Sequence, residues 1–130
     1  MKKIHVALIG NPNVGKTTLF NRLCGVNQKT GNYPGVTVDK KVGKFKHLDF
    51  QIEVTDLPGF DSIYPKSMDE ELVVNYLKNN SGKNHIEKVI FVADGTNIKK
   101  NLYLLSQVKD LGYDIVLAIN LIDIAKRKGI

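Results

Sequence analysis

The sequence predicts an α/β fold, with a mostly parallel sheet, helices on both of its faces and one antiparallel strand at its edge. Short apolar runs alternate with longer segments of helical periodicity, which is the pattern of parallel βαβ units. Two alternating segments, 37–46 and 50–55, are joined by a short turn, which predicts a hairpin and hence the antiparallel strand. The composition, 42% hydrophobic and 25% charged over 130 residues, is ordinary for one globular domain.

The expected elements follow one another in a regular order. Strands are predicted at 3–9, 37–46, 50–55, 88–93 and 114–119, and helices at 16–25, 68–78 and 97–111. Ser67 and Glu70 have the spacing of a capping box at the start of the second helix, and Gly112 is a stop signal after the third. Residues 26–36 are rich in loop formers and lack a period, so we expect a loop there.

Helical periodicity also predicts which side chains point to the core. The first and third helices each carry an apolar stripe, and Cys24, the single cysteine, is expected on the buried side of the first. The stripes comprise Leu19, Phe20 and Leu23 in the first helix and Leu102, Leu105 and Val108 in the third.

The motif G-x-x-x-x-G-K-T occupies Gly10–Thr17, between an apolar run and a helical segment. This strand–loop–helix context is that of a phosphate-binding P-loop. Gly10 and Gly15 allow close backbone approach, so successive amides can point at phosphate oxygens. Lys16 can place a cation near the terminal phosphates, and the Thr17 hydroxyl can ligate Mg²⁺. The simpler alternative is a glycine turn beside a solvated lysine.

The tetrapeptide Asp56–Gly59 follows a predicted strand, at the sheet edge where ligands bind in α/β folds. The Asp56 carboxylate can support Mg²⁺, usually through water, and the Gly59 amide can meet a γ-phosphate. The same four residues also make a good turn, but their position after a P-loop favours the functional interpretation. Thr37, after the 26–36 loop, can complete the Mg²⁺ shell once a γ-phosphate is present, although a lone threonine carries little information.

A third motif, Asn120-Leu-Ile-Asp123, follows the last predicted strand. The Asp123 carboxylate can accept hydrogen bonds from N1–H and the N2 amino group of guanine, whereas adenine offers neither donor. Buried polar pairing of this kind rejects the wrong analogue strongly. Asn120 is expected to tie this loop to the P-loop or to contact guanine N7. The alternative is a helix N-cap at Asn120 or Asp123.

The net charge of +6 bears on the choice of partners. Lysines are spread along the chain, with small clusters at 40–46 and 126–128, and we interpret them as solvated. Attraction to an acidic partner or to an anionic membrane surface is the alternative. The apolar runs are too short for a membrane helix, and no signal-peptide pattern opens the chain. The three histidines are scattered, so no transition-metal site is expected.

These motifs, in this order, resemble a P-loop NTPase of the small G-protein type. More narrowly, the chain resembles the N-terminal G domain of the ferrous iron transport protein B family over essentially its whole length. The stretches that carry this resemblance are Gly-Asn-Pro-Asn-Val-Gly-Lys-Thr-Thr-Leu-Phe-Asn from Gly10, Gly-Asn-Tyr-Pro-Gly-Val-Thr-Val from Gly31, Asp-Leu-Pro-Gly-Phe-Asp-Ser-Ile from Asp56, Asp94–Asn97 with Lys100–Leu105, and Asn120–Lys126.

The resemblance implies GTP binding and hydrolysis that drive or regulate ferrous iron uptake by a membrane-embedded permease portion of the same full-length protein. It implies the cytoplasmic face of the cell membrane, Mg²⁺ as cofactor, no nucleic-acid partner and a homo-oligomer formed through the full-length protein. It also implies a helical bundle and one more G-domain strand and helix. Because the chain ends soon after Asp123, we expect residues 1–130 to be a truncated G domain, with weakened guanine affinity and an unpaired edge at 114–119.

Two residues depart from the pattern of many GTPases. Leu121 stands where lysine is common, but apolar residues are frequent there in this family, so the guanine assignment holds. Phe60 stands where many GTPases carry a water-orienting glutamine, so hydrolysis is expected to be slow without help. Related GTPases with asparagine at the position of Asn13 bind K⁺ beside the β- and γ-phosphates. We therefore expect Asn13 and carbonyls of loop 28–35 to hold K⁺, a loop-stabilising amide being the alternative.

The expected site is then complete. Catalytic residues are Asn13, Lys16, Thr37 and Gly59, with Thr17, Thr37 and Asp56 on Mg²⁺ and Asn13 on K⁺. GTP or GDP is expected to contact Gly10, Asn11, Pro12, Asn13, Val14, Gly15, Lys16, Thr17, Thr18, Gly35, Val36, Thr37, Asp56, Leu57, Pro58, Gly59, Asn120, Leu121 and Asp123. Segments 26–37 and 57–68 are the expected nucleotide-dependent switches. The alternatives are a regulatory switch without meaningful hydrolysis, a ribosome- or RNA-associated GTPase and, more distantly, an adenine-nucleotide kinase.

Overall fold

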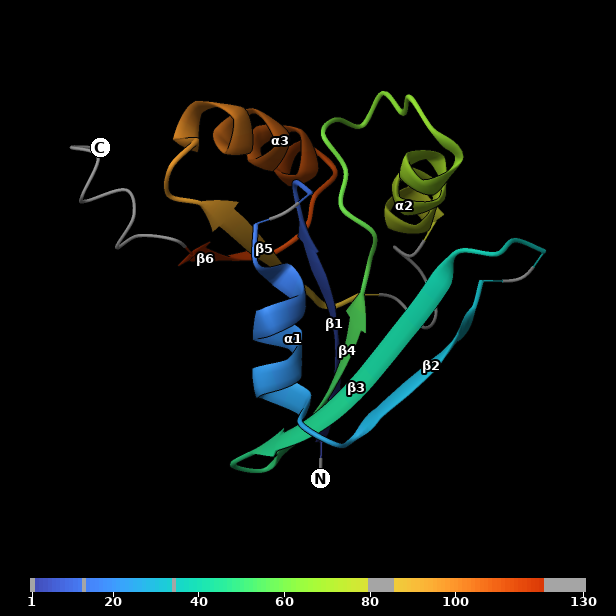
Figure 1. Cartoon of the computed structure of the whole chain (residues 1–130). Coiled ribbons are helices and arrows are strands. Elements are labelled where there is room, and N and C mark those ends of the chain that lie inside the picture. The colour runs from blue at the N-terminus through green and yellow to red at the C-terminus, as the bar shows by residue number, and fades with distance from the viewer. Residues whose placement is uncertain (1, 13, 34, 80–85, 121–130) are drawn as a thin grey trace.

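The computed structural model describes residues 2–12, 14–33, 35–79 and 86–120. Strands and helices alternate along this part of the chain (Figure 1). The elements are β1 (Lys2–Gly10), α1 (Lys16–Cys24), β2 (Gln28–Asn32), β3 (Asp39–His47), β4 (Phe50–Asp56), α2 (Met68–Asn79), β5 (Lys88–Asp94), α3 (Ile98–Asp110) and β6 (Ile115–Asn120).

The described strands form one sheet in the order β2-β3-β4-β1-β5-β6. β1 pairs in parallel with β4 and β5, and β5 pairs in parallel with β6, which confirms the mostly parallel sheet. β3 is antiparallel to both of its neighbours. The four parallel strands β4, β1, β5 and β6 therefore end at the same edge of the sheet, and the predicted nucleotide-binding motifs begin there.

The prediction was wrong about the edge strand. The hairpin strand β3 lies inside the sheet, and the edge is β2, within the 26–36 segment that was expected to be a loop. Gln28 pairs with Gly43 and Asn32 with Asp39, while most β2 side chains are exposed. Because main-chain pairing rather than burial holds β2, its polar sequence carries no period that could have revealed it.

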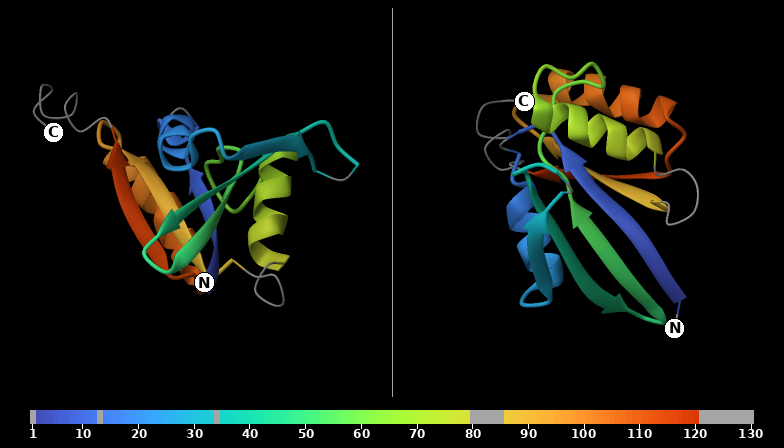
Figure 2. Two further views of the ribbon diagram at one scale, coloured as in Figure 1. Left: turned by 90° about the horizontal axis from the view of Figure 1, so that it is seen from below. Right: turned by 90° about the vertical axis from the view of Figure 1, so that its right-hand side faces the viewer.

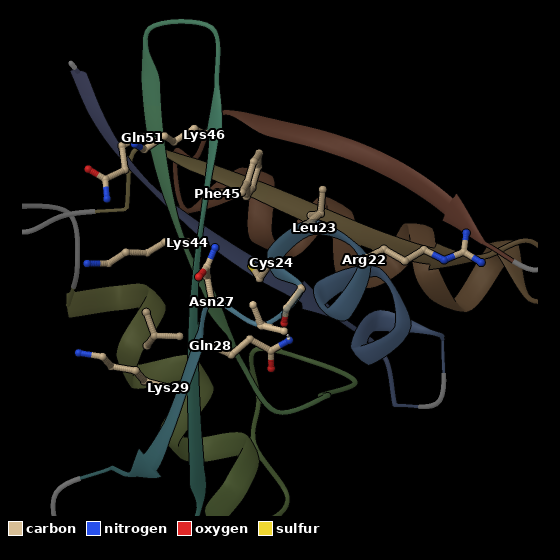
Figure 3. A pocket seen from close by; sticks show the side chains of 13 residues that line it. Arg22, Leu23, Cys24, Asn27, Gln28, Lys29, Lys44, Phe45, Lys46 and Gln51 are labelled. Carbon is tan, nitrogen blue, oxygen red and sulfur yellow. Dashed lines mark hydrogen bonds between the residues drawn. The ribbon is translucent and has the colours of Figure 1, made fainter.

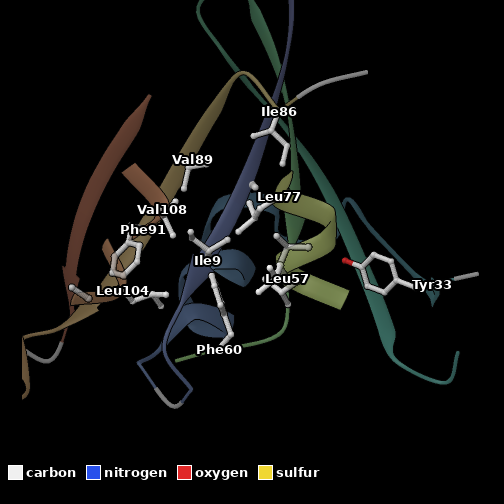
Figure 4. Close-up of a cluster of buried hydrophobic side chains, with 14 residues drawn as sticks. Ile9, Tyr33, Leu57, Phe60, Leu77, Ile86, Val89, Phe91, Leu104 and Val108 are labelled. Atoms are coloured by element: carbon white, nitrogen blue, oxygen red, sulfur yellow. The ribbon is translucent and has the colours of Figure 1, made fainter. Parts of the chain in front are cut away.

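Helices cover both faces of the sheet, as predicted. Figure 2 shows α1 on one face and α2 beside α3 on the other. The smaller core cluster lies under α1 and joins Phe20 and Cys24 to Leu8, Val54 and Val92. The larger cluster lies under α2 and α3, around Ile9, Leu57, Phe60, Leu77, Val89, Phe91, Leu104 and Val108 (Figure 4). None of the helices in the described ranges is long and apolar enough to cross a membrane.

Cys24 is buried, as predicted, and burial raises the pKa of its thiol. It packs closely against Gly43 of β3. A Cβ on Gly43 would lie 2.3 Å from Cys24 Sγ, so only glycine fits opposite the cysteine.

The inward face of α3 was predicted only in part. Val108 is fully buried and Leu105 packs at the margin of the core, but the Leu102 side chain is 47% exposed. Asn101 is buried in its place, because its side chain is satisfied: Oδ1 accepts from the Asp94 amide at 3.0 Å and Nδ2 donates to the Asn97 carbonyl at 2.7 Å. A polar residue thus lies on the buried face of α3, so that face is rotated from the one that the apolar residues predict.

The helix boundaries follow the predicted signals closely. Ser67 Oγ accepts from the Glu70 amide at 3.1 Å, which confirms the N-cap of α2. The Glu70 side chain does not turn back to Ser67, however: Oε1 accepts from the Lys66 amide and Oε2 from the Asp61 amide. Gly112 follows α3 with a φ of 93°, a left-handed conformation typical of a helix stop.

Candidate functional site

The P-loop connects β1 to α1 at the common edge of the parallel strands. Gly15 precedes α1 with a φ of 85°, and no side chain caps the helix there. A Cβ on Gly10 would lie 2.6 Å from the carbonyl oxygen of Val92 on β5. Both glycines are therefore required by the backbone, and the α1 N-terminus presents its amides to an incoming anion.

The segment after β4 runs directly along the P-loop. The Leu57 amide donates to the Leu8 carbonyl, and the Phe60 amide donates to the Gly10 carbonyl, both at 3.1 Å. A Cβ on Gly59 would lie 2.8 Å from Pro12 Cα. The predicted tetrapeptide therefore packs backbone to backbone against the predicted phosphate loop.

Two cavities of about 540 and 510 Å³ border this junction, and they are adjacent because Lys16, Thr17 and Gly59 line both. The first is lined by Asn11, Pro12, Val14, Gly15, Lys16, Thr17, Thr18 and Gly59. The second is lined by Lys16, Thr17, Thr37, Val38, Asp39, Lys41, Asp56, Leu57, Pro58, Gly59 and Asp69. We call the two together the P-loop cavity.

Lys16 and Asp56 form an ion pair inside the P-loop cavity. Their side chains are 11% and 5% exposed, so each charge is largely removed from water. A polyphosphate with a divalent cation offers both residues a replacement partner, the phosphate for Lys16 and the cation for Asp56. The oxygen donors of Thr17, Thr37 and Asp56 line one cavity, and this hard donor set fits Mg²⁺.

The segment that carries Thr37 is held against α2. Thr37 itself is exposed and faces the P-loop cavity. The Tyr33 amide donates to the Val38 carbonyl at 3.1 Å, and the Tyr33 ring meets that of Tyr76 edge-on at 6.2 Å between centroids. Lys40 Nζ lies 5.7 Å from the Tyr33 ring centroid. Burial raises the pKa of Tyr33, as do the neighbouring Tyr76 and Asp56 to a smaller extent.

The structure does not bring every predicted residue to the cavity. Val36 lines a separate groove against α2, and Gly35 is exposed with a φ of 76°. Asn120 pairs with Asp94 at the end of β6, so its backbone reaches the correct sheet edge. Asn13, Leu121 and Asp123, which carry the predicted K⁺ site and most of the guanine site, lie outside the described residues.

Phe60 is fully buried in the larger core cluster, so its ring does not face the P-loop cavity. Asn11 has a role that sequence reasoning missed. Its Nδ2 donates to the Phe60 carbonyl at 3.2 Å and to Asp61 Oδ1 at 3.0 Å. Its Oδ1 is buried with no hydrogen-bond partner among the described residues. No sequence signal joins two positions so far apart in the chain.

A larger cavity, of about 900 Å³, lies away from all of these residues (Figure 3). It sits between the end of α1 and strands β2 and β3, and of the predicted site it includes only Gln28 and Lys29, from the 28–35 stretch expected beside K⁺. Figure 3 shows its cationic side chains pointing apart, with Arg22 on one side and Lys29 and Lys44 on the other. They do not converge on one point as a phosphate site requires.

Comparison with known proteins agrees with the P-loop assignment. The family profile described as ferrous iron transport protein B matches residues 4–130. The chain is 46% identical over 126 residues to an Fe(2+) transport protein A/Fe(2+) transporter FeoB fusion protein of Porphyromonas gingivalis, covering 97% of this chain and 15% of the relative. It is 42% identical over 134 residues to the Fe(2+) transporter FeoB of Escherichia coli K12, covering all of this chain and 17% of the relative.

Solved structures give the same result. The G domain of the T. maritima FeoB iron transporter matches with a TM-score of 0.89 and 42% identity, covering 96% of this chain and 76% of that one. The cytosolic domain of the T. maritima transporter in its GMPPNP form matches with a TM-score of 0.87 and 44% identity, covering 97% of this chain and 48% of that one.

Proposed function

The chain belongs to the ferrous iron transport protein B family, and we propose that it is the GTP-binding and GTP-hydrolysing domain of a ferrous iron transporter. One observation carries the proposal. Lys16, Thr17, Thr37, Asp56 and Gly59 come from three separate segments and line one cavity. Related FeoB structures are described in GDP and GMPPNP forms, which supports a guanine nucleotide as the ligand.

We assign the phosphates to the P-loop amides and to Lys16. The α1 N-terminus supplies oriented amides and the positive end of a helix dipole, while Lys16 exchanges Asp56 for phosphate oxygen. Mg²⁺, when bound by Thr17, Thr37 and Asp56, neutralises charge that develops on the phosphates. We assign the γ-phosphate contact to the amide of Gly59, a residue that packs closely against Pro12.

Hydrolysis is the finer part of the proposal. The buried Phe60 cannot orient a water molecule. The chain therefore contributes to hydrolysis by positioning the phosphates and stabilising their charge, and not by a side-chain base. We propose slow intrinsic turnover that K⁺ stimulates through Asn13. A switch that binds GTP and GDP without meaningful hydrolysis is the second candidate, and the burial of Phe60 is the observation that favours it.

Guanine selection is assigned to Asp123, supported by Asn120 and Leu121. The end of β6, where Asn120 lies, is at the same sheet edge as the P-loop cavity, which supports a base-binding role for the residues that follow in the chain. Asp123 then accepts from the two donors that guanine has and adenine lacks.

The chain spans 15% to 17% of the length of the curated relatives that are described above. We propose that the 1–130 domain acts at the cytoplasmic face of the membrane on a permease portion of the same protein, as part of a homo-oligomer. Segments 26–37 and 57–68 carry the nucleotide state to that portion.

Calorimetric titration of the purified chain with GTP, GDP and ATP tests the ligand. Guanine nucleotides should bind and ATP should bind at least 100-fold more weakly. Asp123→Ala should abolish that preference, and Asp110→Ala, on the exposed side of α3, should keep it. An unaltered preference in Asp123→Ala overturns the base assignment.

Phosphate release at saturating GTP tests the reaction. Turnover should be faster in K⁺ than in Na⁺, and Asn13→Ala should remove the difference. No turnover in either salt supports the switch without hydrolysis. Salt-sensitive binding to RNA would instead support the ribosome-associated alternative.

A further inference from the structure

The segment that follows Gly59 is tied to more than the P-loop. In Figure 1 the loop after β4 passes between α2 and α3. Asp61 lies where it meets all of these elements. Asn11 Nδ2 donates to Asp61 Oδ1 at 3.0 Å, and Lys100 Nζ of α3 lies 3.2 Å from the same oxygen. The Asp61 amide donates to Glu70 Oε2 of α2 at 3.0 Å.

Neighbouring contacts strengthen the connection to α3. The Ile63 amide donates to Gln107 Oε1 at 3.1 Å, two turns along the helix from Lys100. Asn11, on the other side of Asp61, is 3% exposed and also holds the Phe60 carbonyl. The chain from Asn11 through Asp61 to Lys100 thus connects a buried side chain of the P-loop to the side of α3.

The start of α3 is itself fixed, so Lys100 is held in register. Asp94 Oδ1 accepts from the Thr96 amide at 2.8 Å and from the Thr96 hydroxyl at 2.6 Å. Asn101 bridges the Asp94 amide and the Asn97 carbonyl. These bonds give the Asp94–Asn97 stretch, which does not line the P-loop cavity, a role in fixing the start of α3. They also fix the position of Lys100, which precedes the buried Asn101.

We propose that Asp61 is a positioning residue: clamped between Asn11 and Lys100, it holds the Gly59 amide in place for a γ-phosphate and couples that position to α3. The inference rests on the proposed function, because it concerns the regulation of the same site. Gly59 is two residues from Asp61 and already lies against Pro12, with the Phe60 amide bonded to Gly10 between them. Because only Phe60 separates the two residues, we expect a shift of Asp61 to displace Gly59 from the phosphate edge of the cavity.

A purely stabilising role does not account for the arrangement. Lys100 and Asp61 are 53% and 42% exposed, and half-exposed ion pairs contribute little to folding. Partial burial works to raise the pKa of Asp61, but the hydrogen bonds from Lys100 and Asn11 and the charges of Lys100 and Lys66 outweigh it, so the pKa lies below its ordinary value. The carboxylate therefore stays charged at neutral pH and available to both partners.

The clamp is testable without nucleotide. Hydrogen–deuterium exchange of the 130-residue chain should show lower protection of amides 60–63 in Lys100→Met and Asp61→Ala than in the wild type. Lys99→Met removes the adjacent exposed lysine, for which the described residues show no ion pair, and should leave protection unchanged. Equal protection in all four proteins overturns the clamp, whether or not the chain binds nucleotide.

The functional claim is tested by comparing GTPγS with GDP. Because only the former meets Gly59, Asp61→Ala and Lys100→Met should weaken GTPγS binding about three- to tenfold and leave GDP binding within twofold of the wild type. Asp61→Asn, which keeps an acceptor for Asn11, should lie between. Equal weakening of both nucleotides overturns the positioning role, as does no weakening. Failure of the wild type to bind either nucleotide overturns the proposed function instead, and the exchange experiment still decides the clamp.

Discussion

Two segments border the P-loop cavity, and the structure holds them in different ways. Residues 57–61 are anchored in the core through Leu57 and Phe60, which are fully buried and whose amides bond to β1. Residues 35–38 lie on the outside, where Thr37 is exposed and Val36 and Val38 are only partly buried. The anchor beside them is a single aromatic residue, Tyr33, against α2.

The difference shows how the two segments can respond to the same ligand. Local opening costs least where few buried contacts must break, so 35–38 can move with little loss of stability. The 57–61 segment can move only together with its contacts to β1 and α2 and with the Asp61–Lys100 ion pair to α3. We therefore expect residues 35–38 to respond to a ligand at a lower cost in stability than residues 57–61.

The largest contrast is expected between core truncations in the two segments. Phe60→Ala should lower the free energy of unfolding by about 3–5 kcal/mol, because it removes a fully buried ring from the larger core cluster. Val36→Ala should lower it by about 1 kcal/mol or less, because Val36 is partly buried at the margin. Urea denaturation measures both, and losses of similar size would contradict the comparison.

Glycine substitutions should separate the segments next. Gly59→Ala should cost about 1–3 kcal/mol of stability, because its Cβ would overlap the Pro12 backbone. Gly35→Ala has free space around its Cβ and should cost about 1 kcal/mol through its left-handed φ of 76°. Gly31→Ala, with free space and no such φ, is the matched control and should be neutral. Thermal unfolding of the three variants measures these losses of stability. A neutral Gly59→Ala would show that Gly59 does not need to pack closely against Pro12.

The parts of the fold that burial determines were predictable from sequence. The buried strands β1, β4 and β5 and the three helices all carry an apolar period or run. β2 carries none, because main-chain pairing alone places it at the edge. The buried face of α3 was predicted only in part because Asn101 is polar and is not expected in an apolar stripe. Its side chain can be buried because it hydrogen-bonds to two backbone groups.

The candidate site divides in the same way. Lys16, Thr17, Asp56 and Gly59 were predictable because the ends of parallel strands converge on one sheet edge. The clamp through Asp61 was not, because it depends on side chains that approach only after α2 and α3 have packed. Val36 is predicted from its motif to contact the nucleotide, and in the structure it lines the groove against α2.

A smaller effect should show how Tyr33 anchors the outer segment. Its hydroxyl is buried and has no hydrogen-bond partner among the described residues, so Tyr33→Phe should be neutral or stabilise the fold by about 1 kcal/mol. Tyr76→Phe should destabilise it by about 1 kcal/mol, because Tyr76 shares a side-chain hydrogen bond with Thr55. The unfolding free energies of the two variants test the pair, and a clear loss in Tyr33→Phe would show that the hydroxyl is needed.

The smallest expected effect is a pH dependence from the same residue. Burial holds the pKa of Tyr33 above its ordinary value of 10.0, so below pH 10 the phenol is neutral in both the folded and the unfolded chain and stability is unaffected. Above pH 10 the unfolded chain loses this proton more readily, and stability falls as pH rises toward the folded pKa.

Tyr33→Phe removes that contribution, so the difference in unfolding free energy between variant and wild type should widen above pH 10. Urea titrations at pH 8 and above pH 10 measure it, and because Tyr76 and Tyr113 also have raised pKa values, both proteins should keep some residual slope. A constant difference across that range would mean that the Tyr33 ring ionises as readily in the folded chain as in the unfolded one, and that α2 does not shield it.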